Sequence, residues 1–440
     1  MLLFIIFWRG NSISILETES SAAGQVNQSA IEVFSLPQFR WLFLGNFAFF
    51  FSMQGQMLTR SLLAWELTRE ATALAYINLV VAIPLVIASL FGGAITDRVE
   101  RRSLIIFGQS FIVANELFIL VLLITGRLEF WHMLCTAFIA GCAFPFIMPA
   151  RMAITMKVVG PLRLQRAMAY QAGSMNLNRI LGPAAMGVII AQYDFGAAYL
   201  LSITLYLCAI TFMFGIEKNY SNERNTEKKP LLADIGYGFK YILEHRPVLI
   251  CLLFGLVPMF LVMPFQNILV VLAEEAWQVE ETGMGILMAT MGLGGMLGAV
   301  WIAQRGDNAS RLNLMISSTF AFGIFLAIFT QTENFYLALL PLLIANVCAS
   351  ASQTVNNTAI QLLVDDSVRG RMSSFMMLSF GLTPIGVFPL AIAADNFGAA
   401  NTILAATVLL MVTVIMFYLA SKTLRNLDHS INNKLSKATN

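Results

Sequence analysis

Charged side chains are scarce in this sequence. Asp, Glu, Lys and Arg make up 12% of the 440 residues, whereas hydrophobic residues make up 58%. A soluble globular protein usually carries about 25% charged residues, so this composition excludes an ordinary aqueous fold. We therefore expect a protein that resides in a lipid bilayer.

Cysteine and histidine are also sparse, with five and three copies. None of the cysteines forms a CxxC pair and the histidines are scattered, so we expect no disulfide, no metal site and no cofactor. No G-x-x-x-x-G-K-[ST] sequence occurs, which excludes ATP bound by this chain as an energy source. The sequence also lacks the His, Asp, Glu and Ser clusters that a membrane enzyme needs. We expect no enzymatic activity and no nucleic-acid partner, and keep a membrane enzyme or an inert scaffold only as an alternative.

Long apolar runs are present instead. A helix needs roughly 20 apolar residues to cross about 30 Å of hydrocarbon. Twelve runs of this kind lie between charged or turn-rich breaks, at residues 41–64, 74–96, 103–125, 131–151, 171–191, 196–215, 247–271, 282–304, 312–330, 335–358, 372–392 and 398–421. The sequence thus predicts an all-α integral membrane protein with twelve transmembrane helices.

The polar stretch at 216–246 is the longest between two spans, and it divides the chain into halves of equal length. A shift of 206 residues places Pro183 on Pro389, which suits two pseudo-symmetric six-helix bundles. The expected domains are a cytoplasmic N-terminal extension (1–40), an N-terminal bundle (41–215), a cytoplasmic linker (216–246), a C-terminal bundle (247–421) and a cytoplasmic tail (422–440). The first eight residues, MLLFIIFW, lack the basic region of a cleavable signal.

The distribution of Lys and Arg predicts the orientation. With the N-terminus inside, 23 of the 27 Lys and Arg residues fall in cytoplasmic segments. Only Arg69 and Arg127 fall in external loops, and Arg60 and Arg179 lie within spans. This asymmetry is a strong positive-inside signal. We predict a multi-pass protein of the cell membrane with both termini in the cytoplasm.

The loop between the second and third spans reads GGAITDRVERR (92–102). Glycines let two helices pack closely, a carboxylate can cap a helix N-terminus, and a cationic cluster faces the inner leaflet. The pattern resembles the G-x-x-x-D-R-x-x-R-R signature of the major facilitator superfamily. The resemblance assigns a conformational role to Gly92, Gly93, Asp97, Arg98, Arg101 and Arg102, and implies that Asp97 engages the start of span eleven.

Further stretches resemble the branch of that superfamily that contains enterobactin exporters and drug-efflux proteins. They are PFIMPAR (145–151), NLNRILGPAAMG (176–187) and RGR (369–371). In the second, Gly182 and Pro183 are similar to the Gly-Pro motif of antiporters. The second-half counterpart of Asp97 is Ala303, and a further glycine beside Gly187 that many antiporters have is missing here.

The resemblance implies alternating access, in which two bundles rock around a cavity formed by spans 1, 4, 7 and 10. It predicts a monomeric secondary active transporter that exports a small amphipathic organic solute, siderophore- or drug-like, in exchange for protons. An uncoupled facilitator or an importer on the same fold is the alternative.

Polar and flexible side chains within these spans are the candidates for the cavity. In span ten, four polar residues recur at helical spacing and form one stripe, which can either line a cavity or join two helices. The candidate lining residues are Asn46, Phe50, Gln54, Met263, Gln266, Asn346, Ser350, Gln353 and Asn357. Without a fixed charge, this set suits a bulky, partly apolar solute.

Charges inside the hydrocarbon are costly and therefore candidates for function. Glu116 lies near the middle of span three, and we predict that it couples transport to protons, with Arg179 as a possible cationic partner. A permanently protonated structural glutamate or a static Glu116–Arg179 pair is the alternative. Arg60, near the end of span one, is expected to extend towards the interface.

Overall fold

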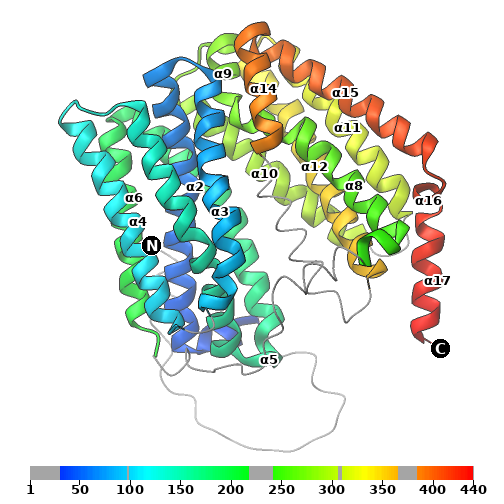
Figure 1. Cartoon of the computed structure of the whole chain (residues 1–440), viewed down its shortest axis with the longest axis horizontal. Coiled ribbons are helices and arrows are strands. Elements are labelled where there is room, and N and C mark those ends of the chain that lie inside the picture. Colours follow the sequence, from blue (N-terminus) through cyan, green and yellow to red (C-terminus); the bar gives the residue numbers. More distant parts are fainter. Residues whose placement is uncertain (1–29, 97–98, 218–240, 306–309, 365–383, 440) are drawn as a thin grey trace, which may run out of the picture.

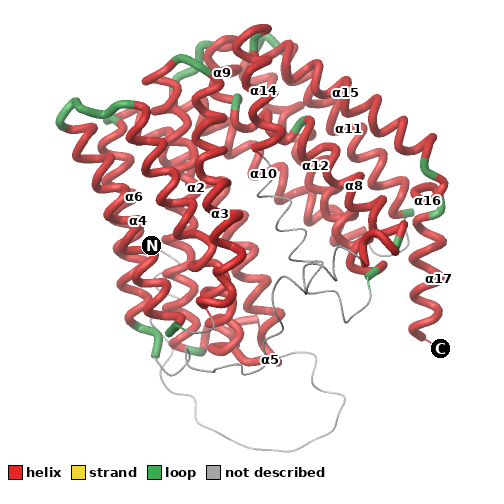
Figure 2. The backbone as a smooth tube through the Cα atoms, in the orientation of Figure 1, coloured by secondary structure: helices red, strands yellow, loops and turns green. Residues whose placement is uncertain are grey.

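The chain folds almost entirely into helices packed side by side (Figures 1 and 2). The computed structural model describes residues 30–96, 99–217, 241–305, 310–364 and 384–439. Eight helical segments in this part are long and apolar enough to cross a membrane, and two shorter apolar helices accompany them. With α2 and the second half of α5, which carry more polar side chains, they correspond to the twelve predicted spans. Span eleven is described only from Pro384 onward.

The first group of helices comprises α2 to α6. A short 3-10 helix, η1 (Ala30–Ser35), precedes them. Their bounds are α2 (Pro37–Thr68), α3 (Ala71–Thr96), α4 (Arg101–Ile124), α5 (Phe130–Gln192) and α6 (Phe195–Phe214). Helix α2 packs on α5 and α6, and α4 packs on the same two helices. Two clusters of buried side chains, both drawn from residues 33–216, form the core of this group.

The second group comprises the helices from α8 onward. Their bounds are α8 (Arg246–Leu261), η3 (Met263–Asn267), α9 (Leu269–Trp277), α10 (Glu281–Arg305), α11 (Arg311–Gln331), α12 (Phe335–Leu363), α14 (Pro384–Phe397), α15 (Ala399–Ala420), α16 (Lys422–Arg425) and α17 (Leu427–Thr439). Helix α12 packs on α10 and α11, and α15 packs on α11, α14 and α8. A large core fills this group, and it extends to Leu58, Ala71, Leu74 and Ala75 of α2 and α3.

Three predicted spans, the fourth, fifth and seventh, have different bounds in the structure. Spans four and five are one element, α5, interrupted only at Gly160, where φ is 72°. The region between them remains helical because it is rich in helix-forming residues. Span seven breaks after Leu261, since Pro264 has no N–H to donate to the carbonyl of Phe260. It continues as η3 and α9.

The C-terminal region, expected to be a cytoplasmic tail, forms α16 and α17. The side chains of Leu427 and Ile431 are fully buried there. Asp428 accepts hydrogen bonds from the N-terminal turn of α11, at Arg311 N (3.0 Å), and Lys434 Nζ donates to the carbonyl of Leu363 at 2.6 Å. The tail is thus attached to the ends of α11 and α12.

The two groups meet along two helix pairs, α5 with α10 and α3 with α14. Glycines make the first contact close: a Cβ added to Gly187 would lie 2.6 Å from the carbonyl oxygen of Glu281 and 3.1 Å from Cα of Gly285. Only small residues permit such an approach of two helix backbones. In Figure 1 the first group lies on the left and the second on the right.

Candidate functional site

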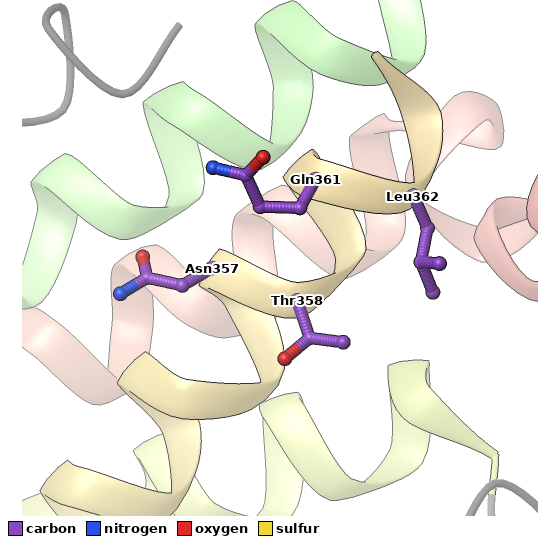
Figure 3. A pocket seen from close by; sticks show the side chains of 4 residues that line it. All are labelled: Asn357, Thr358, Gln361 and Leu362. Atoms are coloured by element: carbon purple, nitrogen blue, oxygen red, sulfur yellow. The ribbon is translucent and has the colours of Figure 1, made fainter. Parts of the chain in front are cut away.

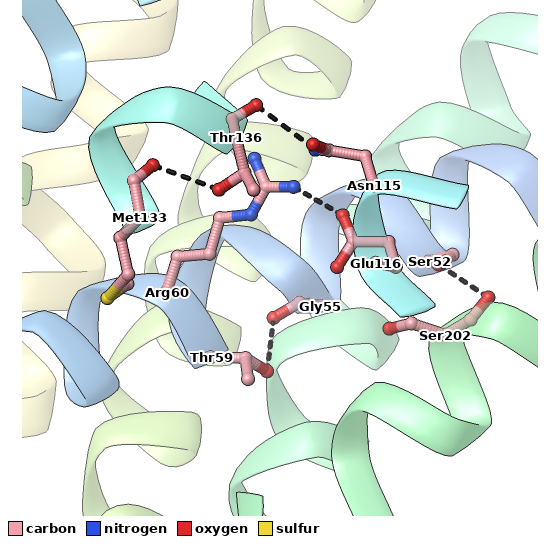
Figure 4. A network of polar contacts seen from close by, with 9 residues as sticks. All are labelled: Ser52, Gly55, Thr59, Arg60, Asn115, Glu116, Met133, Thr136 and Ser202. Carbon is pink, nitrogen blue, oxygen red and sulfur yellow. Dashed lines mark hydrogen bonds and ion pairs between the residues drawn. The ribbon is translucent and has the colours of Figure 1, made fainter. Parts of the chain in front are cut away.

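Glu116 is buried within the first group of helices. Its side chain is 1% exposed, and Oε1 accepts a hydrogen bond and ion pair from Arg60 of α2 (Figure 4). Its other oxygen has no hydrogen-bond partner. Asn115, the neighbour of Glu116 on α4, donates to the carbonyl of Thr136 at 3.0 Å. The carboxylate is therefore held by one cation on one side only.

The cationic partner of Glu116 differs from the predicted one. Arg60 occupies this position, so it extends into the bundle rather than towards the interface. Arg179 lies on α5, where its own backbone carbonyl approaches Gly292 of α10, and its side chain is exposed. The physical reason is helix packing: α2 and α4 both pack on α5 and α6 in this group, and this brings Arg60 and Glu116, which are 56 residues apart, together.

Arg151 is a second buried cation that the sequence did not single out for binding. It was assigned to the cytoplasmic end of span four, but α5 continues to Gly160 and the Arg151 side chain is only 3% exposed. Nη1 donates to Oδ1 of Asn46 on α2, and the guanidinium carbon lies 4.3 Å from the centre of the Phe49 ring. The arginine of the PAR segment, at the end of a predicted span, was the sequence feature that could have indicated this buried charge. The positive-inside interpretation placed it among the cytoplasmic basic residues instead.

The predicted lining residues of α2 divide between two environments. Asn46 and Phe50 are buried inside the first group, where Asn46 contacts Arg151. Gln54 is half-buried, and its Cβ would meet a Cβ added to Gly182 at 3.1 Å, so it lies where α2 crosses α5. Pro183 continues this contact towards α10, because its carbonyl oxygen lies 3.1 Å from a Cβ added to Gly285. The Gly-Pro pair therefore stands at the junction of three helices.

The polar stripe of α12 also divides. Asn346 is buried and donates to Leu342 of its own helix, and Ser350 donates to the carbonyl of Gly295 at 2.7 Å. Both side chains pack on glycines of α10, which favours the helix-joining alternative for these two residues. Gln353 is exposed.

Asn357 lies further along α12 and lines a pocket of about 450 Å³ with Thr358, Gln361 and Leu362 (Figure 3). In η3, Met263 and Gln266 are half-buried and in contact, with Gln266 Nε2 3.9 Å from Met263 Sδ. Open space lined by an amide and a hydroxyl is thus found at the end of α12, and not along the whole stripe.

The loop with the superfamily signature is described in part. Asp97, Arg98 and the start of span eleven lie outside the described residues. Gly92 and Gly93 lie in the last turns of α3, and Arg101 begins α4. Arg102 Nη2 donates to the carbonyl of Phe214 at 3.2 Å, at the C-terminus of α6. A cation at a helix C-terminus is favourable, so Arg102 ties α4 to α6 within one group.

The opposite end of the molecule carries the acidic turns, and we call it the acidic end; it holds residues 66–71, 129, 194, 274–281, 333 and 395. Two carboxylates there join the groups. Glu274 accepts from Arg69 Nη1 at 2.6 and 2.7 Å and from the Trp65 indole. Asp395 accepts from the backbone N–H groups of Ala71 (2.7 Å) and Thr72 (3.0 Å) at the start of α3.

These contacts lie at the ends of helices whose bodies are mainly apolar. The rings of Tyr76 on α3 and Phe388 on α14 add an edge-to-face contact with centroids 5.5 Å apart. No local pattern in the sequence distinguishes Glu274 and Asp395 from the other acidic residues. Their partners are remote in sequence and become visible only in the fold.

Two groups of membrane-spanning helices, which meet at the glycine-lined crossing of α5 with α10 and at the contact of α3 with α14, are the architecture of a major facilitator superfamily transporter. Solved structures agree. The nucleoside transporter NupG has a TM-score of 0.69 at 11% identity and covers 87% of this chain and 99% of its own. A bacterial homologue of the human lysosomal transporter Spinster, inward-facing and unoccupied, has a TM-score of 0.66 at 12% identity, covering 93% of this chain and 99% of its own.

The chain belongs to the transmembrane secretion effector family, which matches residues 28–438. It is similar to the staphyloferrin A transporter of Staphylococcus aureus, with 24% identity over 87% of this chain and 94% of the relative. It is also similar to macrolide efflux protein A of Streptococcus pyogenes, with 20% identity over 80% of this chain and 88% of the relative. The multidrug efflux pump Tap of Mycolicibacterium fortuitum is 24% identical over 79% of this chain and 86% of its own length. These proteins are multi-pass membrane transporters and not enzymes.

Proposed function

We propose that this chain is a secondary active transporter that exports a small amphipathic organic solute from the cell in exchange for protons. The names of the relatives support this direction, because two are efflux proteins and one transports a siderophore. They also support a solute of siderophore- or drug-like size. The protein acts as a monomer in the cell membrane, and both of its termini are cytoplasmic, so the acidic end faces outside.

The observation that carries the proposal is the way in which the two groups meet. At the acidic end, apolar residues of α2 and α3 pack into the core of the second group, and a few polar pairs join the groups beside them. These pairs are Arg69 with Glu274, and Asp395 with the first N–H groups of α3. Such pairs are individually weak and can be exchanged when two rigid bodies rock. The solute is then released outside after these contacts separate, and the 216–246 linker joins the two bundles.

Proton coupling is assigned to Glu116. In the membrane interior a carboxylate is stable when paired with a cation, and here that cation is Arg60. Protonation of Glu116 would remove the ion pair and release the guanidinium from α4. Because Arg60 belongs to α2, which also carries Gln54 and packs beside α5, this change reaches the crossing of the two groups. Arg179 lies at that crossing and is a second candidate for proton coupling.

The solute pathway is assigned to Gln54, Met263, Gln266 and Asn357, which are half-buried. On the cytoplasmic side, Asp97, flanked by Arg98 and Arg102, is proposed to hold the start of span eleven when that side is closed. Asp97→Asn is then expected to impair transport while it leaves solute affinity nearly unchanged.

The test is transport in inverted vesicles that contain the protein and no ATP. Labelled erythromycin and a labelled iron-free siderophore are offered separately, with and without an imposed pH gradient. We expect gradient-driven accumulation of at least one of them, and for Glu116→Gln we expect the gradient response to disappear while exchange of labelled for unlabelled solute persists. Accumulation that ignores the gradient in the wild type would identify a facilitator, and accumulation only in right-side-out vesicles an importer. Gradient-driven accumulation by Glu116→Gln would remove this residue from the mechanism.

A further inference from the structure

Arg151 has one free edge. Its Nη1 is held by Asn46 Oδ1, whereas its Nε and Nη2 atoms are buried and have no hydrogen-bond partner. Nε and Nη2 form the side edge of the guanidinium, from which two N–H bonds point in parallel. This is the arrangement that binds a carboxylate through two hydrogen bonds. Asn46 leaves its own Nδ2 unpartnered as well.

The three unpartnered atoms are all donors. They belong to two adjacent side chains that are each 3% exposed, and one of them carries a full positive charge. A buried charge is unfavourable unless it is paired, and buried donors are unfavourable unless they are bonded. The rings of Phe49 and Phe50, at 4.3 and 6.0 Å from the guanidinium carbon, contribute a weaker cation–π attraction but accept neither hydrogen bond.

No carboxylate of the described residues pairs with Arg151. The two ion pairs found there use Arg60 with Glu116 and Arg69 with Glu274. Arg60 provides the comparison within the same helix group: its side chain is more exposed, at 21%, and it has an internal counter-charge. Arg151 is oriented by Asn46 to receive a counter-charge in the same way, and no described residue supplies it.

We propose that the Nε–Nη2 edge of Arg151, with Nδ2 of Asn46, binds a carboxylate group of the transported solute. This inference rests on the proposed function and adds that the solute is an amphipathic organic acid. Phe49 and Phe50 provide an apolar surface beside the acid group, which suits a solute that has both parts. Because Arg151 is 3% exposed, the described conformation is closed over the edge, and binding requires displacement of neighbouring side chains.

An acid site changes the selectivity that the sequence implied. The predicted cavity set has no fixed charge and suits a bulky, partly apolar solute. A guanidinium next to Asn46 attracts an anion and repels a cation at the same position. Among otherwise similar amphipathic solutes, those with a free carboxylate are therefore preferred.

The experiment compares organic acids with their primary amides. The full chain is purified in lipid nanodiscs, and the thermal unfolding midpoint is measured over a concentration series of phenylacetate, indole-3-acetate and cholate, each with the matching amide, and of inorganic phosphate. We expect at least one acid to raise the midpoint of the wild type, its amide to have no such effect, and phosphate to be weaker than that acid. For Arg151→Gln the apparent Kd for the acid should rise by about tenfold or more.

Two further variants address folding and geometry. Arg151→Lys keeps the charge but has no parallel pair of donors, so we expect weakened acid binding in a protein that is folded even if the glutamine variant is not. Asn46→Ala removes one donor and the group that orients Arg151, and should also weaken the acid. Arg127→Gln, at an exposed turn after α4, is the matched control and should bind the acid as the wild type does.

The inference is overturned if every acid acts like its amide, if phosphate matches the acids, or if Arg151→Lys and Asn46→Ala bind an acid as tightly as the wild type. Export is measured separately in inverted vesicles. If the protein binds an acid through Arg151 but does not transport it, the proposed function is contradicted while the inferred acid site still stands. Export of macrolides that is unaffected by Arg151→Lys, together with absent acid binding, supports the function and refutes the site.

Discussion

The contact of Asp395 with the start of α3 offers a direct test of alternating access. Asp395 lies in the last turn of α14 in the second group, and its two carboxylate oxygens accept from Ala71 N at 2.7 Å and Thr72 N at 3.0 Å in the first group. The first N–H groups of a helix have no partner in the helix itself, so this carboxylate caps α3 from another part of the fold. In an alternating-access cycle, this cap would exist only while the acidic end is closed.

Asp395→Ala removes the charge and both acceptors. Loss of a cap and of a carboxylate at a helix N-terminus weakens such a contact by about 1–2 kcal/mol. Since only the closed state contains the contact, the ratio of open to closed acidic ends should rise by about five- to thirtyfold. Because Asp395 is exposed to solvent, we expect a value near the lower limit.

The distance between the two groups can be followed by spin labels at the acidic end. Cysteines at Arg127 and Glu333, both exposed, place one label in each group once the five native cysteines are replaced by serine. Pulsed dipolar spectroscopy then gives the populations of short and long distances. We expect the long-distance population to increase in Asp395→Ala.

Asp194→Ala is the matched control. Asp194 Oδ1 accepts from Ala197 N at 2.7 Å, so it caps α6 within its own group. Its loss weakens the helix equally in both conformations and should leave the distance distribution unchanged. Identical distributions for Asp395→Ala and wild type, or an equal response to Asp194→Ala, would refute the view that this cap holds the acidic end closed.

Three other outcomes are expected. Replacement of Arg60 or Glu116 alone by Met leaves its partner unpaired and should lower the free energy of unfolding by about 3–5 kcal/mol. The double replacement should recover most of that loss. Additive losses would show that the pair is not coupled. Gly187→Ala places a Cβ 2.6 Å from the carbonyl oxygen of Glu281. The resulting strain of about 1–3 kcal/mol should separate α5 from α10 and reduce transport. Gly173→Ala, whose Cβ meets no atom within 4 Å, serves as the control. Reporter fusions should be external at Glu70, Glu129 and Glu280 and cytoplasmic at Arg102, Asn225 and the C-terminus, and a cytoplasmic signal at Glu280 would overturn the proposed orientation of the second half.

The membrane class, the number of spans and the superfamily could be predicted from the sequence. Each rests on properties that are local in the chain: the length of an apolar run, the breaks between runs, and short motifs such as Gly182-Pro183. Hydrocarbon excludes unpaired backbone groups, and so an apolar run of about 20 residues has few choices besides a helix. Helix ends were less predictable: span four was expected to end at Arg151, yet α5 continues through residues 152–159 to Gly160.

Pairing between helices was decided by the tertiary structure. Glu116 could be identified as a buried charge from its position in a span, but Arg60 and Arg179 were both possible partners. The rotation of α2 and α4 about their axes selects Arg60. The same applies to Arg151, whose meaning depends on Asn46, 105 residues earlier, and to Asp395, whose partners lie more than 320 residues away. Helical periodicity defines which residues of a helix share a face, but packing of the whole bundle decides which helix lies opposite that face. The opposite helix in turn determines whether a polar side chain joins two helices, caps the end of another helix or remains available for a solute.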